Sequence, residues 1–528
     1  MTDNIDASAL PILEHDCEII YEKAVTHEQL LALAPKIDAL LVRSASQVSA
    51  DVIEASKGRL KIVGRAGVGT DNIDLPAATR AGIVVVNSPE GNTIAAAEHT
   101  LGMLMALARN IAEGDKTMKQ GQWQRSKLMG TELYGKTLGV VGMGKIGQHV
   151  TKACQAMGMK ILAFDPYLSA SRADELDVRQ ATFDELIIQS DFITLHVPKT
   201  PETTNLFNAE TLKRCKPGLR IINCARGGII DEAALAEVLD SGHIAGAALD
   251  VFAQEPLQAE SPLLKLGKNM LLTPHLGAST TEAQVNVALD VAEQVRDYFL
   301  HGYARSAVNL PLLRKEKLDP MWPYMAMAEM MGKLGRQLLT GPIQHVEVLA
   351  QGAALYPLDV QPLSLAILKG LLSQAREGVT YVNAPVLAEE LGIRVEVTTS
   401  KSAGNYLNLL TLNVSGESGE KTSISATLIA ENTMRVVEIN GYAMALQPTE
   451  HLLFTPHKDQ PGMVAQVAHE LGAAQVNISA MQVGRKSGSQ SAGGQSVMIF
   501  NLDTAPEPSV LNKISALPGI SAAQLIRL

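Results

Sequence analysis

The sequence predicts an α/β protein built around a doubly wound parallel sheet. Short apolar runs alternate with helical patterns over about residues 37 to 109, and a second alternating set starts at Lys136. This alternation is typical of parallel strands joined by crossover helices. The chain has 528 residues, which is too long for one ordinary hydrophobic core. We therefore expect three or four domains.

The second set has six apolar runs, and each of them ends in a turn. Six parallel strands with intervening helices fit a Rossmann-type nucleotide-binding domain. A helix around Glu282–Phe299 is expected to lead the chain back to the first set, which would end near Ala307–Pro311. The six runs are KTLGVVG, KILAFDP, DFITLHVP, RIINCARG, AGAALDVF and NMLLTPHLG.

A charged segment that ends in Pro320, LLRKEKLDP, predicts a domain boundary. Residues 319–447 open with a methionine-rich helical pattern at Met321–Leu339 and end in alternating strands, which predicts an α+β domain. Residues 448–528 read strand, helix, strand, strand, helix, strand, with the serine/glycine loop RKSGSQSAGGQ between the middle strands. That order predicts a small ferredoxin-like sandwich.

Composition excludes several classes of function. The net charge of −10 and the aromatic content of 4% argue against nucleic-acid binding. No apolar run is long enough to span a membrane, and the acidic N-terminus does not resemble a signal peptide. The four cysteines form no CxxC pair, so we expect neither a metal site nor disulfides, and a reduced cytoplasmic location.

The strongest local motif is a glycine turn. Gly142, Gly144 and Gly147 stand in G-x-G-x-x-G spacing between an apolar strand and a helix, and Asp165 ends the next strand. Such glycines let backbone N–H groups approach a pyrophosphate at a helix N-terminus. A carboxylate at Asp165 can bind ribose hydroxyls and would repel a 2′-phosphate, which favours NAD over NADP. The alternatives are a tight turn without a ligand and a helix-capping role for Asp165.

Three polar residues follow successive strands of the same predicted sheet: Arg226, Glu255 and His275. Ligands bind at that edge of an open α/β sheet. A histidine can accept the hydroxyl proton when hydride leaves an alcohol, a neighbouring carboxylate can orient its ring, and an arginine can hold a substrate carboxylate.

Each of these three residues taken alone has an ordinary explanation. Loop histidines usually satisfy a local hydrogen bond, a glutamate before a proline usually lies on the surface, and an arginine after a strand often pairs with an internal acid. Asp250 is similarly ambiguous.

Together the motifs resemble one family, the D-isomer-specific 2-hydroxyacid dehydrogenases. GRAGVGTDNID, GKTLGVVGMGKIG, NCARGG, GAALDVF, EP and TPHLGAST stand in the family's order over about 275 residues. The resemblance is strongest to members that act on D-3-phosphoglycerate. It implies NAD-dependent oxidation of that acid to 3-phosphohydroxypyruvate, the first step of phosphorylated serine biosynthesis, with Arg226, Glu255 and His275 as the catalytic set.

The family has a flavodoxin-like, split substrate domain with the nucleotide-binding domain inserted into it. The resemblance thus implies a substrate domain of residues 1–108 and 288–311 around a nucleotide-binding domain of 109–287. It also implies the residues that line the cofactor, beyond the glycines: Lys145, Ile146, Asp165, Cys224, Ala225, Arg226, Asp250, His275, Leu276, Gly277 and Ala278.

A phosphorylated substrate needs further cations. Arg43 and Arg65 end strands of the first domain, and Arg43 is the better candidate for the phosphate. In related enzymes the segment with Arg125 and Lys127 reaches the neighbouring subunit's site, which implies a homodimer or homotetramer. The alternative for Arg125 and Lys127 is a solvated charge pair.

The C-terminal third resembles two further domains of these enzymes. Residues 319–447 resemble the intervening, allosteric substrate-binding-like domain, and residues 448–528 resemble an ACT regulatory domain. In related enzymes L-serine binds between ACT domains, which implies effector contacts from His457, Asp459 and Asn477. The alternative for these three residues is plain turn chemistry.

Two other functions stay open. Glyoxylate or hydroxypyruvate reductases resemble the first 311 residues but usually lack the C-terminal domains. Corepressors of the family keep the fold and the Arg–Glu–His set but act by binding partners, and they end in a disordered tail. A sensor without catalysis is a third possibility.

Overall fold

The computed structural model describes almost the whole chain, in two compact units. The described residues are 1–267, 269–302, 304–310, 319–430, 433–486 and 494–528. Most of the linker expected before Pro320 and most of the serine/glycine loop lie outside them. The first unit is formed by Met1–Lys23, Arg65–Gly69 and Asn87–Arg296, and the second by Ala24–Gly64, Thr70–Val86 and Asp297–Leu528.

The first unit contains a seven-stranded sheet in the order β10-β9-β8-β7-β4-β5-β6, and all six neighbouring pairs are parallel. The predicted doubly wound sheet is confirmed with all six expected strands. The seventh strand, β6, has only two exposed polar residues and therefore no apolar pattern. The strands are β4 (Thr137–Val141), β5 (Lys160–Phe164), β6 (Arg179–Gln180), β7 (Phe192–Leu195), β8 (Arg220–Asn223), β9 (Gly246–Leu249) and β10 (Met270–Leu272).

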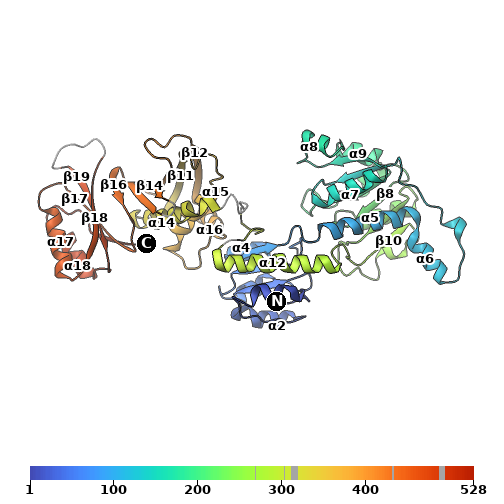
Figure 1. The fold of residues 1–528 in the computed structure, drawn as a ribbon, viewed down its shortest axis with the longest axis horizontal. Helices are drawn as coiled ribbons and strands as arrows, with labels where there is room; N and C mark the ends of the chain where they lie inside the picture. The colour runs from blue at the N-terminus through green and yellow to red at the C-terminus, as the bar shows by residue number, and fades with distance from the viewer. Residues whose placement is uncertain (268, 303, 311–318, 431–432, 487–493) are drawn as a thin grey trace. The chain divides into compact units, whose positions relative to one another are not determined.

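Helices cover both faces of this sheet, so its central strands β4, β7, β8 and β9 are buried on both sides. Ile221 and Ile222 are neighbours on β8, yet they belong to separate hydrophobic clusters on opposite faces. Figure 1 shows the long helix α5 running along this region. The α-helices between residues 93 and 301 are α5 (Thr93–Arg109), α6 (Ile111–Lys119), α7 (Lys145–Ala156), α8 (Ala170–Glu175), α9 (Phe183–Gln189), α10 (Ala209–Arg214), α11 (Glu232–Asp240) and α12 (Thr281–His301).

Three further strands form a smaller sheet in the order β1-β2-β3: β1 (Ala39–Val42), β2 (Ile62–Arg65) and β3 (Val84–Asn87). The chain returns to this sheet after α12, because Asn309 accepts a hydrogen bond from the backbone N–H of Val85. The two compact units do not follow the four predicted domain limits, which remain predictions. The remaining short helices before residue 322 are η1 (Ala7–Ala9), α1 (Leu10–Leu13), α2 (His27–Leu33), η2 (Ala34–Lys36), α3 (Ala50–Ala55), α4 (Leu75–Arg80), η3 (Arg125–Lys127), η4 (Pro262–Lys265) and η5 (Asp319–Met321).

The region after η5 is α+β, as predicted. Its methionine-rich helix α14 (Trp322–Leu338) packs on α15 (Gln361–Ser373), and a six-stranded sheet of order β12-β11-β13-β14-β15-β16 completes the layer. Sequence reasoning missed β11, β12 and β16. The other elements are α16 (Ala384–Glu390), β11 (Ile343–Gln351), β12 (Arg394–Ser400), β13 (Leu409–Gly416), β14 (Lys421–Ala430), β15 (Thr433–Ile439) and β16 (Tyr442–Leu446).

The last part of the chain is the expected βαββαβ sandwich, with strand order β18-β19-β17-β20. Figure 1 shows α17 and α18 together beside its sheet. No helix in the described ranges is long and apolar enough to cross a membrane. The elements are β17 (His451–Lys458), α17 (Met463–Ala473), β18 (Ile478–Arg485), β19 (Gln495–Leu502), α18 (Pro508–Ser515) and β20 (Gln524–Arg527).

Candidate active site

The glycine turn between β4 and α7 has the geometry of a phosphate-binding loop. Gly142 has a φ of +96°, and a Cβ there would lie 2.5 Å from the backbone oxygen of His196. A Cβ on Gly147 would lie 2.1 Å from the backbone oxygen of Gly142, so this glycine lets α7 approach β4. Gly144 has an ordinary φ of −65°, and a Cβ there would meet nothing within 4 Å. The fold does not require glycine at Gly144, and the open space at this helix N-terminus suits a pyrophosphate.

Asp165 lies beside the same turn. Its Oδ2 accepts a hydrogen bond of 2.8 Å from the backbone N–H of Met143, and its Oδ1 accepts one from Tyr167. These bonds hold the carboxylate where a ribose would follow a pyrophosphate bound at the turn. Lys145 opens α7 next to the turn and forms an ion pair with Glu90. The chemistry of the donors and the space beside Gly144 therefore fit a dinucleotide.

The three predicted catalytic residues follow adjacent parallel strands. The last residues of β8, β9 and β10, which are Asn223, Leu249 and Leu272, stand opposite one another in the sheet register. The segments that carry Arg226, Glu255 and His275 therefore start at one edge of the sheet, as the sequence predicted.

The side chain of Asn223 shapes the Arg226 segment. Its Oδ1 accepts a hydrogen bond from the backbone N–H of Ala225, and its Nδ2 donates to the backbone oxygen of Arg226 at 2.9 Å. Arg226 in turn donates from Nη1 to the oxygen of Ala225 at 2.7 Å. A Cβ on Gly227 would lie 1.7 Å from the backbone oxygen of Phe252. This glycine thus allows the Arg226 segment to touch the segment that leads to Glu255.

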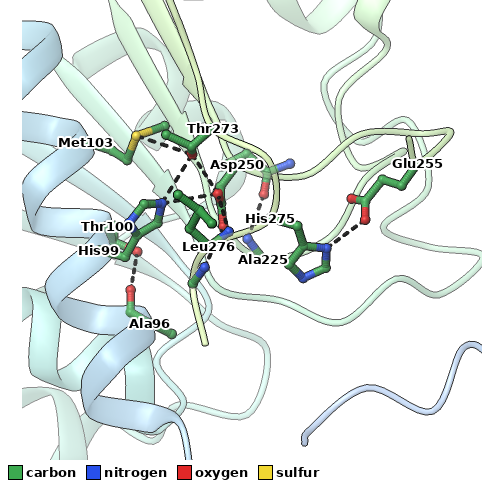
Figure 2. Close-up of polar contacts among 12 residues, drawn as sticks. Ala96, His99, Thr100, Met103, Ala225, Asp250, Glu255, Thr273, His275 and Leu276 are labelled. Atoms are coloured by element: carbon green, nitrogen blue, oxygen red, sulfur yellow. Dashed lines mark hydrogen bonds and ion pairs between the residues drawn. The ribbon is translucent and has the colours of Figure 1, made fainter. Parts of the chain in front are cut away.

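Glu255 and His275 form a direct pair, which Figure 2 shows. Nδ1 of His275 lies 2.7 Å from Oε2 of Glu255, and Oε1 of Glu255 accepts a hydrogen bond from the backbone N–H of Phe252. The carboxylate therefore orients the ring and stabilises a proton on Nδ1. The His275 side chain is 49% exposed, so Nε2 can exchange a proton with a substrate.

The loop that carries His275 has an unusual backbone. His275 has a φ of +56°, in the left-handed region, which costs a non-glycine residue about 1–3 kcal/mol. The surroundings must supply that energy. Backbone hydrogen bonds run from the N–H of His275 to the oxygens of Asp250 and Thr273.

The carboxylate of Asp250 accepts hydrogen bonds from the loop that carries His275 (Figure 2). It is fully buried. Its Oδ1 accepts hydrogen bonds from the Thr273 hydroxyl at 2.6 Å and from the N–H of Leu276 at 2.8 Å, and its Oδ2 accepts one from Gly277. Nε2 of His99 lies 3.1 Å from Oδ1. Burial opposes ionisation of Asp250, but the bonds from His99, Thr273 and Leu276 outweigh it and hold its pKa below the ordinary value.

Two neighbouring ionisable groups are unsuited to acid/base work at neutral pH. The His196 ring keeps some solvent contact but is enclosed by enough protein that desolvation lowers its pKa to about 4. Burial raises the pKa of the Cys224 thiol to about 12. His275 has a carboxylate partner and a side chain that is 49% exposed, whereas the other carboxylate-paired histidine of this region, His99, is 21% exposed.

The predicted cofactor-lining residues not yet described fall in three places. Ile146 lies on α7 and is half-buried, Cys224 and Ala225 follow β8, and Leu276 to Ala278 follow His275. Asp250 also belongs to that predicted set, but its carboxylate already has four partners within the protein. In the described residues no three His, Cys, Asp or Glu side chains are grouped as a metal ion would require.

The predicted substrate cations occupy both units. Arg43 follows β1 and is half-buried. Arg65 ends β2, and its guanidinium lies so close to Gly67 that a Cβ there would be 1.6 Å from Nη1. Arg125 and Lys127 are exposed on η3. Arg43 belongs to the second compact unit, whereas the other three belong to the first.

All three predicted effector residues have partners within the chain. His457 is buried on β17 and faces the backbone oxygen of Thr455 at 3.2 Å. Oδ2 of Asp459 lies 2.7 Å from Nε of Arg485, close enough for an ion pair although not aligned as a hydrogen bond. Asn477 donates to Asp503 at 2.6 Å.

Sequence reasoning missed three residues that build the site: Asn223, Thr273 and His99. Asn223 and Thr273 stand inside the motifs NCARGG and TPHLGAST, so their positions were a usable signal. His99 lies within a helix far from these motifs in sequence, and only the folded structure relates it to Asp250.

Three family models match successive parts of the chain. Residues 101–277 match the family model of the D-isomer specific 2-hydroxyacid dehydrogenase NAD-binding domain. Residues 320–440 match the D-3-phosphoglycerate dehydrogenase intervening domain, and residues 452–519 match the ACT domain.

Relatives are similar over nearly their whole length. D-3-phosphoglycerate dehydrogenase of Synechocystis is 48% identical over 100% of this chain and 94% of its own. The Bacillus subtilis enzyme of the same name is 41% identical over 98% of this chain and 97% of its own.

Solved structures match the dehydrogenase part. An NAD-dependent formate dehydrogenase of Staphylococcus aureus in complex with NAD is 34% identical, with a TM-score of 0.50 over 55% of this chain and 86% of its own. A D-lactate dehydrogenase of Aquifex aeolicus with NAD and lactic acid is 28% identical, with a TM-score of 0.51 over 56% of this chain and 91% of its own. The chain is an NAD-dependent dehydrogenase that belongs to the D-isomer-specific 2-hydroxyacid dehydrogenase family, among the D-3-phosphoglycerate dehydrogenases with an intervening domain and an ACT domain.

Proposed function

We propose that the chain oxidises D-3-phosphoglycerate to 3-phosphohydroxypyruvate with NAD, the first step of phosphorylated L-serine biosynthesis. The main support is the similarity to D-3-phosphoglycerate dehydrogenases across all domains, including the two that follow the dehydrogenase part. The Glu255–His275 pair at the carboxyl edge of the sheet supplies the chemistry.

Each of the three residues has a distinct role in this mechanism. Arg226 holds the substrate carboxylate, because a guanidinium binds such a group with two parallel hydrogen bonds. Nε2 of His275 accepts the proton of the C2 hydroxyl as the carbonyl forms, and Glu255 stabilises the resulting imidazolium. NAD held by the glycine turn and Asp165 would supply the acceptor for the hydride that leaves C2. The C–OH group is thus oxidised to C=O, with the proton on His275.

The alternative functions have weaker support. A glyoxylate reductase of known structure matches 57% of this chain, so its likeness leaves the last part of the chain unexplained. A corepressor-like function leaves the ordered intervening and ACT domains that follow the dehydrogenase part unexplained. The intact Glu255–His275 pair argues for catalysis rather than for sensing alone.

We infer that the cofactor contacts come from the glycine turn, Asp165 and the segments after β8 and β10. Arg43 is proposed to bind the substrate phosphate, with Arg65 in support, because both cations stand at strand ends of the smaller sheet.

A homodimer or homotetramer is proposed as the working form. The segment around η3 exposes large apolar side chains, with Trp123 77% and Met129 85% exposed. Apolar groups that together form a contiguous exposed surface are typical of interaction sites. A partner that covers this segment would bring Arg125 and Lys127 to the subunit interface. The cytoplasmic location stays a prediction.

L-serine is the proposed effector, bound by the ACT domain. Asp459 can take its ammonium group, and Asn477 can bind both ends of an amino acid. Because Arg485 and Asp503 occupy these groups, serine would replace internal partners on binding.

The substrate proposal is tested by comparing kcat/KM for 3-phosphohydroxypyruvate and hydroxypyruvate with NADH. The two acids differ by the phosphate, so a site with a cation for it should prefer the phosphorylated acid by about 100-fold or more. Equal values would contradict the proposed substrate and leave a general 2-hydroxyacid reductase.

The acid/base assignment predicts that His275→Asn abolishes turnover, because asparagine cannot take up the proton, with a loss of about 10³-fold or more. NADH affinity, measured by fluorescence titration, should change little. Turnover close to that of the unaltered chain would refute the assignment.

The glycine turn predicts different outcomes for two neighbouring substitutions. Gly144→Ala should leave the unfolding temperature unchanged but weaken NADH binding by about tenfold, since the methyl group enters the space left for the pyrophosphate. Gly147→Ala should lower the unfolding temperature because its Cβ collides with Gly142. If Gly144→Ala bound NADH normally, the pyrophosphate would lie elsewhere.

For the effector, Asp459→Ala should remove inhibition by L-serine and leave kcat unchanged without serine. Asn477→Ala serves as a second contact variant, and it should weaken inhibition in the same assay. Inhibition that persists in Asp459→Ala would place the effector elsewhere.

A further inference from the structure

The carboxylate of Asp250 joins the catalytic loop to α5, and His99 makes the connection on the α5 side. Three of its four partners, Thr273, Leu276 and Gly277, belong to the loop around His275. The fourth, His99, comes from α5, which packs against β8, β9 and β10. Figure 2 shows the His99 ring on one side of Asp250 and His275 on the other.

The hydrogen bonds determine which His99 nitrogen carries a proton. The Thr273 hydroxyl donates to Asp250 at 2.6 Å. The hydroxyl hydrogen of Thr273 is therefore not available to His99, although Nε2 of His99 lies 3.2 Å from the hydroxyl oxygen of Thr273. Asp250 is an ionised acceptor, so Nε2 must be the donor in both contacts. His99 thus contributes an N–H group, which a neutral or a charged ring can provide.

A buried carboxylate is stable only when its oxygens are fully hydrogen-bonded. Loss of the His99 donor would leave Oδ1 of Asp250 with fewer partners in a site without solvent access. The carboxylate would then rearrange, and the same carboxylate holds the N–H groups of Leu276 and Gly277. The left-handed backbone of His275 depends on that loop.

We propose that His99 is a positioning residue for catalysis, which acts through Asp250 to hold the His275 imidazole against Glu255. The inference rests on the proposed acid/base role of His275. It assigns a function to a side chain of α5 that does not contact the Glu255–His275 pair directly in the hydrogen bonds of the described residues.

The test compares His99→Leu with His99→Gln in the full-length chain, using 3-phosphohydroxypyruvate and NADH. Glutamine can place an amide N–H near the position of Nε2, whereas leucine offers no donor. His99→Leu should lower kcat by about ten- to a hundredfold, as small misplacements of a catalytic group do. KM and the NADH dissociation constant should stay within about threefold, and His99→Gln should recover most of kcat.

The matched control is His243→Leu, a half-buried histidine that precedes β9 at the opposite edge of the sheet from the site. Its Nε2 has no hydrogen-bond partner within the described residues, so its replacement should leave kcat unchanged. Unfolding temperatures are recorded for all variants. A loss in His99→Leu that glutamine does not recover, or one that falls equally on NADH affinity, would overturn the proposal.

Two more variants complete the test. If His99→Leu does not fold, His99→Ala, which also lacks a donor, takes its place and is combined with Thr273→Val. Because both donors act on one carboxylate, the combined effect on kcat should differ from the product of the single effects, whereas a simple product would contradict the proposal. His275→Asn distinguishes the acid/base role of His275 from the positioning role of His99. Activity in that variant refutes the acid/base role itself, while its inactivity beside an unaffected His99→Leu refutes only the positioning role.

Discussion

The candidate active site depends on one buried charge, the carboxylate of Asp250. Asp250 follows β9 and is completely shielded from solvent. Its carboxylate stays ionised because hydrogen-bond donors from α5 and from the loop after β10 surround it. An ion in such a position is far more costly when a partner is missing than when it is saturated. The geometry of α5, β9 and the loop after β10 is therefore fixed jointly. The contacts of Asp250 hold the loop that carries the strained backbone of His275. The imidazole ring of His275 stays exposed to solvent.

Parallel strand register is the second constraint, and it explains how residues distant in the sequence come to one edge. Asn223, Leu249 and Leu272 end adjacent strands in step. The segments beyond them must leave the sheet at the same level. The side chain of Asn223 makes two hydrogen bonds that turn the Arg226 segment back. Gly227 lets that segment contact the backbone of Phe252, in the segment that leads to Glu255. Reactive side chains on loops are thus positioned by a rigid sheet.

The sequence was most informative where one residue type meets one physical requirement. Glycine spacing predicted the turn, and strand-end positions predicted Arg226, Glu255 and His275, because both follow from local pattern and sheet topology. Pairing between remote segments has no such signal. The role of His99 requires knowing that α5 passes behind Asp250. Similarly, the short exposed strand β6 carries no apolar pattern, and its existence follows only from its place beside β5.

The sheet formed by β17 to β20 packs directly against the intervening domain, which bears on regulation. Leu453 packs under α17 and α18, whereas its neighbours Leu452 and Phe454 belong to the same hydrophobic cluster as the methionines of α14. Gln337 adds two bonds to the backbone of Arg527 on β20. The ACT domain therefore shares its core with the intervening domain and does not stand as a separate module. A ligand that shifts β17 or β19 must also disturb the packing of α14, because close-packed interiors deform together rather than residue by residue.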